Sequence, residues 1–142
     1  MAIIGGIVNS FKSEVLQGLH DFTLSTGDVF KIALYTSSAS LGPSTTAYTA
    51  TGEASGTGYT AGGATLTNVT PTLSLRVGIT DFANPTWTTS TITARAALIY
   101  NSTNSNRAVA VLNFNSDKTS SASTFTVVMP TADSLNAIVR VT

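Results

Sequence analysis

Apolar side chains recur at every second position over much of the chain, which is the spacing of β-strands that bury one face. Stretches rich in Asn, Asp, Ser and Pro separate the apolar runs, at 101–106, 116–121 and 130–134, and such residues favour turns. The pattern predicts an all-β fold, an antiparallel β-sandwich or jelly roll of about seven or eight strands with one short N-terminal helix. The expected strands cover these segments: 29–35, 64–69, 73–80, 92–98, 108–114, 125–129 and 138–141.

The segment near the N-terminus has the period of a helix instead. Its apolar residues stand three, four and four positions apart: Val8, Phe11, Val15 and Leu19. Polar residues occupy positions between them, as in a short amphipathic helix. Asn9 or Ser10 is suited to cap the start, and Gly18 is suited to the end. We therefore expect residues 1–20 to form an arm and this helix.

Residues 37–63 differ from the rest of the chain, because Ser, Thr, Gly and Ala dominate and Tyr48 and Tyr59 are the only aromatic residues. Glu53 is the only charged residue among them. A long glycine-rich segment buries little apolar area, so we expect a loop that leaves the body and contacts a partner. Tyrosines are good interface anchors. Two interpretations of Tyr48 and Tyr59 stay open: they bind a partner, or they fold back over the domain's own core.

The amino-acid composition excludes several classes of function. The 142 residues predict one domain, 1–142, and only 10% of them are charged, against about 25% in ordinary domains. In place of charge, 25 Thr and 17 Ser hydrate the surface. Seven basic residues balance seven acidic ones, which excludes nucleic-acid binding by bulk charge. No apolar run reaches the roughly 18 residues of a membrane span, and the absence of cysteine excludes disulfides and Cys-ligated zinc.

No pattern of catalytic residues stands out. His20 is next to Asp21, but sequence neighbours point apart, and a catalytic triad is defined by positions in space. The segment 52–56 only superficially resembles the turn that holds a serine nucleophile. The carboxylates are scattered singly, so we expect no catalytic, cofactor or metal site. Trp87 has two open interpretations: an interface anchor or sugar platform, or a ring that closes one end of the core.

Several segments of the sequence resemble those of small virion structural proteins of tailed bacteriophages. They are the segments 30–38, 46–63, 92–100 and 108–112. The likeness extends from about residue 9 onward and lies in recurring phrases rather than in a catalytic motif. Some small β-sandwich proteins of such virions serve as capsid cement or decoration subunits. The resemblance therefore implies a component of the virion, and a cement role implies the capsid surface.

A cement role implies that the chain bridges copies of the major capsid protein, or other virion proteins, and itself forms a dimer or trimer. The expected clamps are the N-terminal segment 3–8 and the loop 37–63. The candidate partner contacts are Ile3, Ile4, Ile7, Phe11, Tyr48, Tyr59 and Trp87. Two rival functions stay open: a tail or fibre component that binds host glycans through exposed aromatic rings, and a hydrolase of cell-wall sugar that uses Glu53 and His20.

Overall fold

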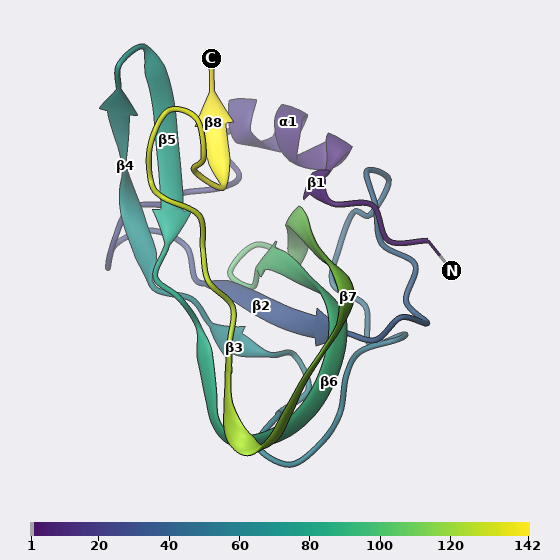
Figure 1. Ribbon diagram of the computed structural model, residues 1–142. Coiled ribbons are helices and arrows are strands. Elements are labelled where there is room, and N and C mark those ends of the chain that lie inside the picture. Colours follow the sequence, from purple (N-terminus) through teal and green to yellow (C-terminus); the bar gives the residue numbers. More distant parts are fainter. Residues whose placement is uncertain (1) are drawn as a thin grey trace.

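The computed structural model describes residues 2–142 and shows two antiparallel sheets with one short helix (Figure 1). Its elements are β1 (Gly6–Ile7), α1 (Asn9–Leu16), β2 (Phe30–Tyr35), β3 (Ala64–Thr65), β4 (Asn68–Ser74), β5 (Val77–Phe82), β6 (Thr86–Asn101), β7 (Arg107–Thr126) and β8 (Val139–Val141). The larger sheet has the strand order β1-β7-β6-β2-β3, and the smaller sheet has the order β4-β5-β8. This arrangement confirms the predicted all-β sandwich.

Strand β2 lies at the centre of the core, because both of its faces are covered. Phe30, Ile32 and Leu34 are fully buried on one face, and Ala33 and Tyr35 are fully buried on the other. The strand pairs with β6 on one side and with β3 on the other. Apolar residues on both faces are typical of a strand that is covered by two layers.

Strands β6 and β7 form one long ribbon that bends over at the lower end of the molecule in Figure 1. The pairing between them shifts register on either side of Ser90, and such irregularities bend and twist a ribbon. The buried Ser90 hydroxyl lies 3.0 Å from the carbonyl oxygens of Trp87 and Ser123, which satisfies polar groups at the bend. Trp87 and Phe125 sit on the same part of the ribbon with ring centroids 6.0 Å apart, and both rings belong to the core.

The segment 116–121, predicted as a turn, lies within β7 instead. The partner strand explains the difference. Thr93 faces Thr119 across the ribbon with their hydroxyl oxygens 3.1 Å apart, and Arg95 forms an ion pair with Asp117 at 2.8 Å. Cross-strand pairs of this kind stabilise a sheet. They join residues that are far apart in the sequence, so the local turn preference of 116–121 could not predict them.

Helix α1 is shorter than predicted, and its start is different. Val8 is the N-cap residue, without a capping side-chain hydrogen bond, so the predicted caps Asn9 and Ser10 are wrong. The backbone explains the position, because the Val8 N–H donates to the Val109 carbonyl at 3.0 Å and extends the pairing of β1 with β7 up to the helix. At the other end Gly18 has a φ of +74°, which fits the predicted end of the helix.

The segment 37–63 packs against the body, contrary to the expectation of a loop that leaves it. Ala39, Leu41 and Ala54 are buried in the core. The N–H of Ala54 donates to the Leu34 carbonyl at 2.8 Å, which ties the segment to β2. The segment has few large apolar residues, and backbone hydrogen bonds and close packing of its small side chains hold it against the body.

Candidate functional site

An apolar groove of about 720 Å³ lies between the end of α1 and one face of the β4-β5-β8 sheet. Leu73, Gly78 and Val141 are direct neighbours across its three strands, so they lie in one row on that face. Gly78 has no side chain in the middle of the row, which leaves the surface hollow there. Val15 of α1 also lines the groove.

Large apolar side chains stand exposed at the groove and beside it. Leu73 and Val141, which line it, are 73% and 59% exposed. Leu16 at the end of α1 and Leu75 in the turn between β4 and β5 are 87% and 84% exposed. Large apolar side chains exposed around a groove favour association with another protein. The groove is therefore our candidate functional site.

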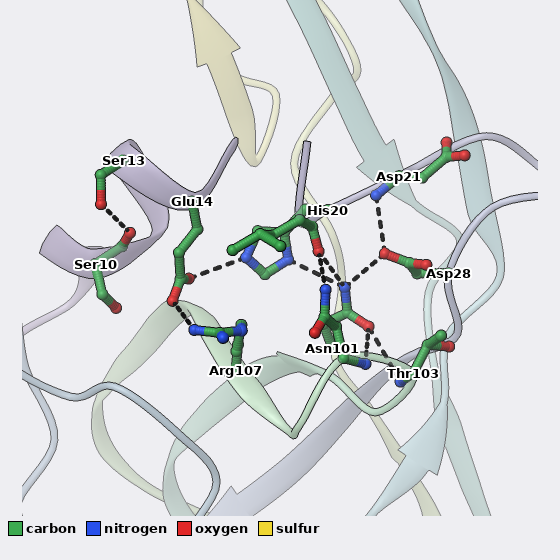
Figure 2. A network of polar contacts seen from close by, with 11 residues as sticks. Ser10, Ser13, Glu14, His20, Asp21, Asp28, Asn101, Thr103 and Arg107 are labelled. Atoms are coloured by element: carbon green, nitrogen blue, oxygen red, sulfur yellow. Dashed lines mark hydrogen bonds and ion pairs between the residues drawn. The ribbon is translucent and has the colours of Figure 1, made fainter. Parts of the chain in front are cut away.

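His20, which lines the groove, belongs to a largely buried polar network, and Figure 2 shows the contacts of this network. The Glu14 carboxylate of α1 accepts hydrogen bonds from His20 Nε2 at 3.0 Å and from Arg107 Nη1 at 2.8 Å. On the other side of the imidazole ring, the Asn101 amide nitrogen lies 3.1 Å from His20 Nδ1 and 2.7 Å from Asp28 Oδ2. The network joins α1, the segment that follows it, and both strands of the β6–β7 ribbon.

The Asn101 amide fixes which imidazole nitrogen carries the proton. Its oxygen accepts the backbone N–H groups of Thr103 and Asn104, both at 3.1 Å, so its NH₂ group must face His20. His20 Nδ1 is therefore an acceptor, and Nε2 carries the proton that is donated to Glu14. Both imidazole nitrogens are engaged and the side chain is fully buried, which fits a tie between segments.

The electrostatics of Glu14 follow from these contacts. Burial alone raises the pKa of its carboxyl group, but the hydrogen bonds from His20 and Arg107 outweigh burial and lower the pKa below its usual range. The ionised carboxylate is thus favoured in the folded protein. The sequence interpretation placed Glu14 among the polar positions of the helix. The available signal was its spacing of three residues from Phe11, which puts both on the buried face.

A second polar cluster holds the 37–63 segment in place. The Glu53 carboxylate accepts hydrogen bonds from the hydroxyls of Tyr48 and Tyr59 and from the N–H of Gly62, each at 2.7 Å. The hydrogen bond to Glu53, together with burial, raises the pKa of Tyr48 to about 12. The other two tyrosines, Tyr35 and Tyr100, donate to backbone carbonyls of the same segment. The four tyrosines of the chain therefore all fasten this segment.

The predicted partner contacts lie elsewhere than the groove. Phe11 and Trp87 are only 3% and 6% exposed, so these two predictions need correction: both rings fill the core and offer no face to a partner. Tyr48 and Tyr59 are half-buried and pack against the core, as in the second of their two interpretations. Their role as contacts stays a prediction.

The remaining predicted contacts lie in the N-terminal segment. Ile3 and Ile7 are half-buried against the core, whereas Ile4 is 55% exposed. The segment is bound to its own chain, because the Ile4 N–H donates to the Leu41 carbonyl at 2.9 Å and β1 pairs with β7. His20 and Glu53, the two residues of the hydrolase hypothesis, belong to separate networks.

Comparison with known proteins finds no family model, curated protein or solved structure that matches this chain. Within residues 2–142, no helix has the length and apolarity to cross a membrane. The same residues hold no group of three or more His, Cys, Asp or Glu side chains arranged to bind a metal ion.

Proposed function

We propose that this chain is a structural subunit of a tailed-phage virion that binds neighbouring capsid proteins and stabilises the shell, as cement or decoration proteins do. The observation that carries the proposal is the exposed apolar surface of a weakly charged chain. Besides the groove, Ile4, Val128 and Leu135 are 55%, 75% and 76% exposed. Exposure of apolar side chains to water is unfavourable, and contact with a neighbouring protein removes it.

The open edges of the sheets offer a second means of attachment. β4 and β8 are the outer strands of the smaller sheet, and β1 and β3 are the outer strands of the larger one. An edge strand can pair with extended backbone of a neighbouring protein. On a shell, many symmetry-related copies act together, so contacts of about 800 Å² per partner or less suffice. The action is mechanical, because each bridge raises the free energy needed to separate two capsid proteins.

The resemblance of the sequence to small phage virion proteins supports this particular assembly. The expected partners are the major capsid protein or other virion proteins, and the expected location is the capsid surface. The alternative is a tail or fibre component that binds host glycans through exposed rings. Trp87 is only 6% exposed, and the hydroxyl groups of Tyr48 and Tyr59 both donate hydrogen bonds to Glu53. The three rings offered for sugar stacking are thus largely engaged within the chain, which favours the cement role.

Particles assembled without this chain provide the test. We expect them to form with normal size and to release their DNA at a lower temperature than complete particles. Purified wild-type chain added back should restore the release temperature. A variant with Val128→Asn and Leu135→Asn, which removes two exposed apolar side chains outside the groove, should restore it less. Equal thermal robustness of the particles with and without the chain would exclude a cement role.

A further inference from the structure

The turn between β4 and β5 holds a leucine where the backbone favours a different residue. Ser74 pairs with Val77, so Leu75 and Arg76 form a two-residue turn. Leu75 has a φ of +57°, a conformation that glycine and asparagine adopt readily and a bulky apolar residue rarely does. Its side chain is 84% exposed. A strained backbone and an exposed apolar side chain at one residue favour a role in a contact.

The groove has the shape and chemistry to receive this turn from another molecule. Its hollow lies over Gly78, and its walls include the apolar side chains of Val15 and Val141. The charge also matches: Asp21 lies at the groove with an exposed side chain, and Arg76 is next to Leu75 in the turn. Arg76 forms no ion pair among residues 2–142. Leu75 and Arg76 in the turn of one molecule therefore match the apolar hollow and Asp21 at the groove of another.

We propose that two copies of the chain associate by placing the β4–β5 turn of each in the groove of the other. Turn and groove lie close together, because Leu75 is three residues from Gly78 in the chain and three residues span at most about 10 Å. A two-fold axis between two copies therefore brings each turn to the other groove, which makes a closed, reciprocal contact. Leu75 enters the hollow over Gly78, and Arg76 pairs with Asp21 of the other copy. The proposal rests on the association role proposed above and names the surface for self-association.

Sedimentation velocity on the full-length chain over a range of concentrations tests this contact. The wild-type chain should form a dimer. Leu75→Asn places a residue that tolerates positive φ in the turn and removes the apolar side chain, so the dimer dissociation constant should rise at least about tenfold while the fold is kept. Gly78→Val fills the hollow from the other side of the contact and should have the same effect. A Cβ at Gly78 would lie 3.9 Å from the Val141 Cβ, which is an ordinary contact distance, so this variant should fold normally.

Two further sets of variants sharpen the result. Leu135→Asn is the matched control, because Leu135 is 76% exposed and lies outside the groove, and it should leave the dimer unchanged. Arg76→Glu and Asp21→Lys should each weaken the dimer, and their combination should restore it, since the pair is then reversed between the two copies.

A chain that stays monomeric at every concentration would overturn the proposal. A dimer that Leu75→Asn and Gly78→Val leave intact would also overturn it, because another surface would then hold the dimer. Growth into open-ended chains would overturn the closed two-fold contact. The proposed function fails separately: a monomer that still restores the release temperature contradicts only the dimer, whereas a groove-dependent dimer that does not restore it contradicts only the cement role.

Discussion

Glu53 is the acceptor that fastens the 37–63 segment, and its replacement by alanine should destabilise the fold. Three donors lose their partner: the hydroxyls of Tyr48 and Tyr59 and the N–H of Gly62. A hydrogen bond to a charged group contributes about 1.5–3 kcal/mol. The site is half-buried and water can replace part of each bond, so we take about 1 kcal/mol for each. The free energy of unfolding should fall by about 3 kcal/mol, or the melting temperature by roughly 10 °C.

Urea unfolding measures this change, with Trp87 fluorescence and circular dichroism as independent probes. Glu53→Gln is the matched control. It keeps an oxygen that can accept from Tyr59 and Gly62, so it should lose only about 1 kcal/mol. Amide exchange should rise within the 37–63 segment of Glu53→Ala before it rises in β2 or β6. A Glu53→Ala protein within about 0.5 kcal/mol of the wild type would refute the reasoning.

Four other variants test the remaining contacts, two by urea unfolding over a pH series and two by thermal unfolding. The pKa of Glu14 is lowered from 4.5, so its stabilisation is complete above that pH and lost as the pH falls through the folded pKa; Glu14→Gln should flatten this acid limb. The pKa of Tyr48 is raised from 10.0 to about 12, so its stabilisation is lost between those pH values. The pKa values of Tyr35, Tyr59 and Tyr100 are raised as well, so Tyr48→Phe should reduce this alkaline limb without removing it. An unchanged pH profile would contradict either assignment. Gly63→Ala should lower the melting temperature strongly, because a Cβ at this φ of +81° would overlap the Ile32 carbonyl oxygen. Gly42→Ala is the control, because its Cβ would make only ordinary contacts. Similar melting temperatures for the two variants would count against this packing.

The fold class could be predicted because the alternation of apolar residues is a local property of each strand. The central strand 29–35 was predicted almost to the residue, and it is observed as Phe30–Tyr35. The length of β7 could not be predicted in this way. The sequence of its polar middle is typical of a turn, but in the structure Thr119 and Asp117 pair with residues of β6. Strand pairing over such distances in the sequence is decided by tertiary structure.

The candidate site was beyond the reach of the sequence for the same reason. Leu73, Gly78 and Val141 form one row only after β8 joins the small sheet. Glu14, His20 and Asn101 meet only after the β6–β7 ribbon brings its turn to the helix. The sequence did identify residues 37–63 as unusual, but its small side chains concealed how closely the segment packs. From the sequence alone, a leucine in a predicted strand or turn looks the same whether its side chain is buried in the core or exposed on a contact surface.

A density map of the assembled particle by electron microscopy tests the central claim most directly. A phage that encodes this chain should show its β-sandwich on the outside of the capsid, across the boundaries between neighbouring capsid proteins. Density for the chain in the tail or fibres, or a capsid surface without it, would contradict the account.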